Sequence, residues 1–145
     1  MYKRIVLAYD GSQSGQRALL DCRDIAHLVK SELFLIAVMP LPVEFAGGEI
    51  GIVDQGHDER ERKQYQAILD EGIRRLAEAG HTPTGEVVVG DAVDEIANCA
   101  RRVQADLIIV GHRHLQGWAR RWWRGSVSKA LIEQAPCSVL VVITQ

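Results

Sequence analysis

The sequence lacks several features that would mark particular classes of protein. No apolar run reaches the roughly 18 residues that cross a bilayer, and the opening MYKRIVLAYD turns to a strand pattern too early for a secretory signal. Cysteine is scarce: Cys22, Cys99 and Cys137 stand far apart within apolar patterns, which excludes a disulfide framework and predicts reduced core residues in a cytoplasmic protein. A net charge of −2 gives no broad basic surface for nucleic acid, so any preference for anions must be local.

Acidic residues are also missing from one long stretch, Leu107 to Ile132. Within it, Val110 to Ser128 reads VGHRHLQGWARRWWRGSVS and holds all three tryptophans of the chain. The same segment carries four arginines, namely Arg113, Arg120, Arg121 and Arg124. A cationic loop with several glycines predicts an anion site, and the phosphates of a nucleotide are the anion that we expect.

The 145 residues are enough for one domain with a continuous core, and we expect a single domain over residues 1–145. Short apolar runs predict buried strands at 4–10, 32–42, 85–90, 106–111 and 138–143. Helical spacing predicts a helix between each pair of strands, with Ser14, Asp91 and Ser126 as N-caps and Gly80 ending the second helix. The irregular segment before that second helix predicts a long glycine-rich loop.

Alternation of strands and helices predicts a three-layer α/β fold, with a five-stranded parallel sheet and helices on both faces. In such sheets, ligands bind beyond the carboxyl ends of the strands, where the direction of winding reverses. The first strand ends at Asp10 and the fourth at Gly111, so we expect these tips to be neighbours. The cationic loop begins at this edge.

Backbone amides at a helix start, assisted by glycine, form the usual kind of phosphate site. Gly111 would let the chain turn sharply, and Gly125 and Ser126 open the last helix. The hydroxyls of Ser126 and Ser128 could then face the same anion. Asp10 suits an amine or hydroxyl donor on a base or a sugar. The pattern therefore predicts a mononucleotide, without separating ATP from AMP or a cyclic nucleotide.

Common catalytic and nucleotide fingerprints are absent. The chain has no G-x-x-x-x-G-K-[ST] loop, no G-x-G-x-x-G after the first strand and no G-x-S-x-G elbow. Ser12 and Ser14 have no evident base, and His112 and His114 form a His-x-His pair with no third metal ligand of fitting spacing. We therefore expect neither an enzyme nor a metal site.

Five segments together resemble the universal stress protein family: KRIVLAYDGSQSGQRAL, IAVMP, VGDAVDEI, ADLIIVGHRH and RGSVSKALIEQAPCSVLVV. The resemblance runs the full length of the chain. It implies a Rossmann-like adenine-nucleotide-binding fold, a homodimer that pairs through the last strand (Ser138 to Ile143), and binding of ATP with Mg²⁺. A small regulatory or stress-response protein is the function that it implies.

The resemblance also implies a set of ATP-binding residues. It places Asp10 and Ala8 beside the adenine, with the Val38 backbone also contacting it, and Val110 and Gly111 near the ribose and phosphates. It implies that Gly125, Ser126, Val127 and Ser128 grip the triphosphate. The remaining residues of the predicted ATP-binding set are Tyr9, Arg113 and His114.

Two departures from the family motif fall in the loop. The second motif glycine is His114, and ten residues instead of nine separate it from Gly125. A non-glycine residue held at positive φ costs about 1–2 kcal/mol, which is around tenfold in affinity. A hydrogen bond from His114 to a phosphate oxygen would recover part of that loss.

Other interpretations of the loop stay open. Arg120, Arg121 and Arg124 fit a solvated surface as well as phosphate contacts, and Trp122 and Trp123 fit core or interface packing. The RRWWR run could also stack on single-stranded nucleic acid, although little basic surface supports this elsewhere. The alternative function is a nucleotide-free dimeric adaptor that acts through protein–protein contacts.

Overall fold

The structure, a computed structural model, describes residues 1–40, 55–113 and 127–144, and only the backbone of residues 55–58. Its strands are β1 (Arg4–Ala8), β2 (Glu32–Met39), β3 (Thr84–Val89), β4 (Leu107–Arg113) and β5 (Ser138–Thr144). They form one sheet in the order β3-β2-β1-β4-β5, and every neighbouring pair is parallel. The predicted five-stranded parallel sheet is confirmed.

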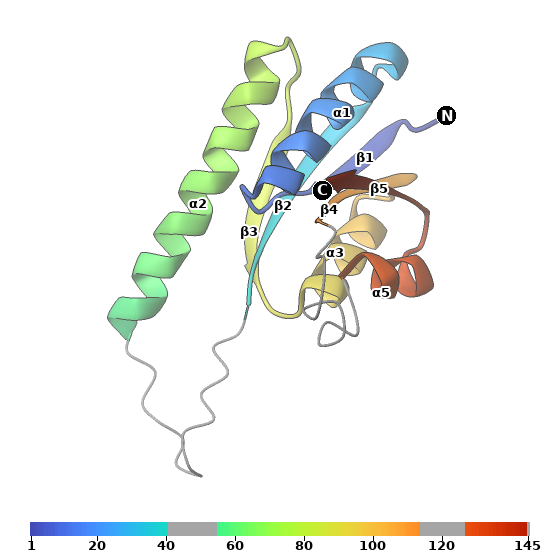
Figure 1. Ribbon diagram of the computed structural model, residues 1–145. Coiled ribbons are helices and arrows are strands. Elements are labelled where there is room, and N and C mark those ends of the chain that lie inside the picture. The colour runs from blue at the N-terminus through green and yellow to red at the C-terminus, as the bar shows by residue number, and fades with distance from the viewer. Residues whose placement is uncertain (41–54, 114–126, 145) are drawn as a thin grey trace.

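Helices cover both faces of this sheet. They are α1 (Gln13–Val29), α2 (Gln55–Glu78), α3 (Ala92–Arg102) and α5 (Val127–Gln134). Helices α1 and α2 lie on one face, and α3 and α5 lie on the other (Figure 1). The three layers follow from right-handed crossovers, which return each parallel strand to the sheet over a helix.

The apolar core is split by the sheet into two clusters, because successive side chains of a strand point to opposite faces. On β1, Ile5 and Leu7 pack beneath α1 and α2, whereas Val6 packs beneath α3 and α5; all three are fully buried. A central strand covered on both faces must be apolar at consecutive positions, as this one is. Burying a side chain of this size contributes about 1.5–3 kcal/mol.

Two predicted helix boundaries are confirmed. Asp91 caps α3, since its Oδ1 accepts a hydrogen bond from the Asp94 amide at 3.1 Å. Gly80 follows the end of α2 at φ +91°, and the next amide, that of His81, donates to the Leu76 carbonyl at 3.1 Å. A residue with positive φ that closes such a bond ends a helix, and glycine adopts this φ without steric cost.

The cysteines are free, and two of them are buried core residues, as predicted. Burial raises the pKa of the Cys22 thiol to about 12, because the thiolate would lose its hydration. Cys99 is buried on the other face of the sheet, and Cys137 is half-buried. Within the described residues, no helix is both long and apolar enough to cross a membrane.

Candidate functional site

The carboxyl tips of β1 and β4 are neighbours, as the sequence predicts. The two strands pair directly, with Ala8 opposite Val110. Strands β1, β2 and β3 step outward in one direction, and the chain then crosses back to place β4 on the other side of β1. Winding therefore reverses between β1 and β4, which is where ligands enter sheets of this kind.

Asp10 forms a tight turn at the tip of β1. Its Oδ1 accepts hydrogen bonds from the Ser12 amide at 2.9 Å and from the Ser12 hydroxyl at 2.5 Å. Gly11 permits the turn because its φ is +74°. The other carboxylate oxygen of Asp10 makes no hydrogen bond to the described residues, so the side chain keeps an acceptor at the mouth of the crevice.

The N-cap of α1 is Ser12, so the predicted cap at Ser14 is wrong. Ser12 has extended backbone angles, and its Oγ accepts a hydrogen bond from the Gly15 amide at 3.0 Å. Ser14 lies inside the first turn, where it is buried and its hydroxyl is 3.1 Å from that of Ser12. The positive φ of Gly11 starts the helix one residue after Ser12, and apolar spacing alone does not reveal that turn.

Gly111 brings the tip of β4 into contact with the first turn of α1. A Cβ atom at this position would lie 2.3 Å from the Ser14 carbonyl oxygen and 2.8 Å from the Gly15 amide nitrogen. Only glycine fits so close a backbone approach. The turn that was expected to begin at Gly111 does not begin there, because β4 continues to Arg113.

Alternation along the strands sorts four of the predicted ATP-binding residues between the two faces of the sheet. Ala8, Val38 and Val110 lie on the α3 and α5 face, where they are part of the second core cluster. Tyr9 lies on the α1 and α2 face, and a Cβ at Gly72 of α2 would be 2.9 Å from its ring. Burial raises the pKa of the Tyr9 phenol. The Tyr9 ring therefore belongs to the core, and its amide donates to the Ile36 carbonyl of β2 at 2.9 Å.

Helix α2 leans over the turn at the tip of β1. A Cβ at Gly11 would be 3.0 Å from Ile68, and Tyr65, one helical turn earlier, packs against the same cluster. The pKa of the Tyr65 phenol is raised, first by burial and then by the carboxylates of Glu61 and Asp10. The crevice is thus bordered by α2 on the face that carries Tyr9.

His112 and Ser128 connect β4 to α5. Because Gly111 faces α1, His112 faces the opposite side, toward α5. Its Nδ1 lies 3.4 Å from the Ser128 hydroxyl, at the long end of the hydrogen-bonding range, and Ser128 is only 6% exposed. Arg113 shares the face of Gly111 and is exposed. The prediction included Arg113 and omitted His112, which strand alternation would have favoured had the strand been extended past Gly111.

Three predicted site residues, His114, Gly125 and Ser126, lie outside the described residues, as do Trp122, Trp123 and the arginines at 120, 121 and 124. The predicted cap at Ser126 lies outside them as well, as do most of the predicted glycine-rich loop before α2 and most of the cationic loop that was expected to begin at Gly111. Val127, the first residue of α5, is 37% exposed. The described part of the site is therefore the strand tips and the first residues of α5.

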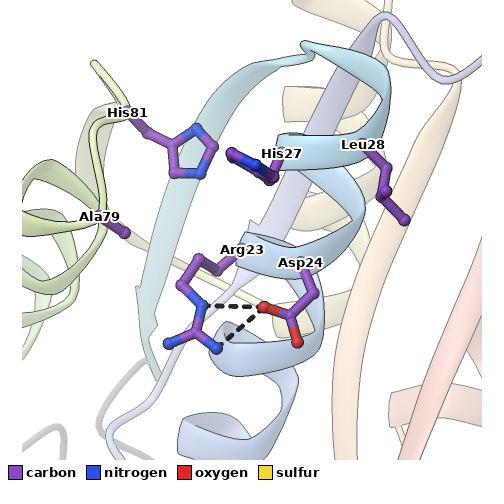
Figure 2. Close-up of a pocket in the computed structure, with 6 residues that line it drawn as sticks. All are labelled: Arg23, Asp24, His27, Leu28, Ala79 and His81. Carbon is purple, nitrogen blue, oxygen red and sulfur yellow. Dashed lines mark hydrogen bonds and ion pairs between the residues drawn. The ribbon is translucent and has the colours of Figure 1, made fainter.

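An open hollow of about 450 Å³ lies elsewhere, between the carboxyl-terminal ends of α1 and α2. Figure 2 shows the rings of His27 and His81 beside each other there, with the Arg23–Asp24 ion pair nearby. Both ends precede strands, so the hollow lies at the amino edge of the sheet, away from the crevice. Among the described residues, no three His, Cys, Asp or Glu side chains could hold a metal ion.

Comparison with known proteins agrees with this architecture. The model of the universal stress protein family matches residues 1–142. The chain belongs to this family. Rv1636, a universal stress protein of Mycobacterium tuberculosis (strain ATCC 25618 / H37Rv), is 30% identical over 144 residues, which cover 99% of this chain and 97% of the relative.

Solved universal stress proteins share the fold. One, in complex with cAMP, is 26% identical with a TM-score of 0.73, and the match covers 99% of each chain. A family member from Arabidopsis thaliana with AMP bound is 18% identical, with a TM-score of 0.69 over 99% of this chain and 92% of the other. At that lower identity the likeness concerns the fold alone. The universal stress protein fold predicted from the sequence is confirmed.

Proposed function

We propose that this universal stress protein binds an adenine nucleotide, ATP with Mg²⁺, at the carboxyl tips of β1 and β4. The observation that carries the proposal is the reversal of winding between these strands, with the amino-terminal turn of α5 held beside the tip of β4. A solved relative of the same fold is complexed with cAMP, which supports an adenine nucleotide as the ligand class. ATP in preference to AMP or cAMP is part of the proposal.

The described residues fit such a ligand. Ala8 and Val38 are partly buried and offer apolar surface to an adenine ring, while Asp10 offers a carboxylate oxygen to an amine or hydroxyl donor. The first amides of α5 have no partners within the helix, and they carry the positive end of its dipole. Negative phosphates would therefore lie toward Val127 and Ser128, and the base toward β1.

The role that we propose is regulatory. Nucleotide binding would shift the protein toward a state with different contacts to a partner in the cytoplasm. The chain would act by binding and not by catalysis, because the sequence carries no G-x-S-x-G elbow and no evident base for Ser12 or Ser14. Any hydrolysis of ATP should be slow.

We also propose a homodimer formed through β5. This strand lies at the edge of the sheet, and its segment Ser138–Thr144 contains no charged residue or proline to protect the edge. Apolar side chains are exposed on the strand and on the helix that precedes it: Ile143 of β5 is 55% exposed and Ile132 of α5 is 63% exposed. Pairing with a second copy would cover both the open edge and this apolar surface.

Calorimetry with ATP and Mg²⁺ tests the nucleotide site. We expect Asp10→Ala to weaken binding about tenfold or more, because a charge-assisted hydrogen bond contributes about 1.5–3 kcal/mol. Asp24→Ala is the matched control, since Asp24 is an acid on α1 at the opposite edge of the sheet. No heat from the wild-type protein at millimolar ATP would refute the proposal and favour the nucleotide-free dimeric adaptor.

A further inference from the structure

We propose that His112 is a positioning residue for the nucleotide phosphates, acting through its contact with Ser128. This inference rests on the proposed function and adds to it a residue that the family motif does not specify. The His112 ring joins the tip of β4 to the first turn of α5, so it sets where the amides and hydroxyl of that turn lie relative to the crevice.

The direction of the His112 ring is fixed by its neighbours. On one side in sequence, Gly111 is pressed against α1, with room for no side chain. On the sheet, His112 lies in register with Ile143 of β5, so its backbone is part of a continuous ladder. Successive side chains of a strand point to opposite faces of the sheet. Because Gly111 faces α1, the side chain of His112 must face α5. The ring therefore projects from a rigid element.

The His112 ring points toward Ser128, and this contact is what gives the direction of the ring its effect. It is the second residue of α5, within the turn whose amides have no carbonyl partners inside the helix. Its side chain is buried, although serine is usually exposed, so its hydroxyl needs a polar neighbour. His112 Nδ1, 3.4 Å away, is that neighbour. Without it, both the hydroxyl and the turn lose a contact that holds them against the strand.

Whether His112 Nδ1 donates or accepts in its hydrogen bond with Ser128 Oγ decides whether the Ser128 hydroxyl can donate to a phosphate. A serine hydroxyl has one proton to donate and two lone pairs that accept. When Nδ1 of His112 carries the proton and donates it to Oγ, the hydroxyl proton of Ser128 is released to donate to a phosphate oxygen. When Nδ1 accepts, that proton is consumed. Nucleotide binding should thus favour the form of His112 that is protonated on Nδ1.

The experiment compares ATP with adenosine, because only ATP carries the phosphates. We expect His112→Ala to weaken ATP binding about three- to tenfold, the range for loss of one hydrogen bond, and to leave adenosine binding unchanged. Asparagine has a polar atom as many bonds from the backbone as Nδ1, so His112→Asn should recover most of the ATP affinity. His27→Ala, which removes an exposed histidine at the opposite edge, should change neither ligand.

Ser128→Ala and the double variant complete the test. If His112 acts through Ser128, losing both side chains should cost no more ATP affinity than losing Ser128 alone, and the free energy of unfolding should also show non-additivity. Wild-type ATP affinity in His112→Ala, or equal losses for ATP and adenosine, would overturn the inference. If the wild-type protein binds neither ligand, the proposed function fails and the phosphate role falls with it; the unfolding cycle then still reports whether His112 and Ser128 are coupled.

Discussion

Single atoms decide how closely the elements around the crevice approach each other. At Gly111, a strand tip and a helix turn meet backbone to backbone, and at Gly15 an added Cβ would lie 2.6 Å from the carboxylate of Asp10. Both glycines lie where a ligand would enter. Their absent side chains place the amide-rich start of α1 and the tip of β4 next to each other, which brings the residues of two distant segments to one crevice.

Substitution of Gly111 should therefore be severe. We expect Gly111→Ala to lower the free energy of unfolding by about 3 kcal/mol or more, because the clash at 2.3 Å is with backbone that cannot swing away. Gly80→Ala is the control: nothing lies within 4 Å of its Cβ, and the strain of its positive φ should cost only about 1–2 kcal/mol. Denaturant unfolding measures both. A smaller loss for Gly111 than for Gly80 would contradict this account of the contact.

At the scale of elements, the helices of this protein begin and end by different local means. Helix α1 starts at a serine cap preceded by a glycine turn, α2 ends at a glycine with positive φ, and α3 starts at an aspartate cap. Helix α3 is also strongly amphipathic, with its buried face formed by Val93, Ile96, Ala97, Cys99 and Ala100. Caps stabilise the ends, and the apolar face fixes each helix to the sheet.

The cap of α3 can be tested without touching the core. Asp91→Ala should lower the free energy of unfolding by about 1 kcal/mol, because the Asp94 amide loses its acceptor. Asp91→Asn retains a side-chain oxygen at the same place and should stay within a few tenths of a kcal/mol of the wild type. Equal destabilisation by both changes would show that charge, and not the hydrogen bond, gives this residue its effect.

The sheet at the centre of the molecule is open, so it has two edge strands, β3 and β5. Strand β3 carries Glu86, which is ion-paired with Arg102 of α3, so that edge strand carries charge. Strand β5 has neither charge nor proline, and apolar surface lies beside it. The difference between the two edges is the physical reason to expect assembly at β5.

Ile143→Lys tests that expectation. A lysine on the edge strand should convert a dimer into a monomer, as measured by light scattering at micromolar concentration, while the monomer stays folded because Ile143 is already 55% exposed. Leu28→Lys is the control, since Leu28 is 82% exposed and lines the hollow between the carboxyl-terminal ends of α1 and α2. A wild-type monomer, or a dimer that survives the change at Ile143, would exclude this interface.

Much of this architecture could be predicted from the sequence because it is encoded locally. The short apolar run in RIVLA is typical of a strand covered on both faces. The spacing of Tyr65, Ile68, Leu69, Ile73 and Leu76 is typical of a helix with one buried face. Alternation of the two patterns then limits the topology to a parallel sheet. The first and fourth strands were expected to meet where the winding reverses, and the pairing of β1 with β4 confirms it.

The residues around the crevice were harder to predict because their roles depend on tertiary contacts. Tyr9 was assigned to the site, but its ring packs against Gly72 of α2. Ser14 was assigned as a cap, but the turn at Gly11 moves the helix start. His112 could not be predicted as a site residue, because nothing in the sequence shows that β4 continues beyond Gly111. The cap of α1 lies two residues before the predicted one, and β4 extends two residues past Gly111.

The sequence by itself determined the order of strands and helices, their apolar faces and the edge of the sheet where a ligand would lie. The tertiary structure decided which side chains at that edge face which way. The physical reason is that burial patterns repeat over many residues and are read reliably, whereas the direction of one side chain depends on where a strand ends and on which backbone it meets. At Gly111 that backbone belongs to α1, and the contact turns His112 toward α5.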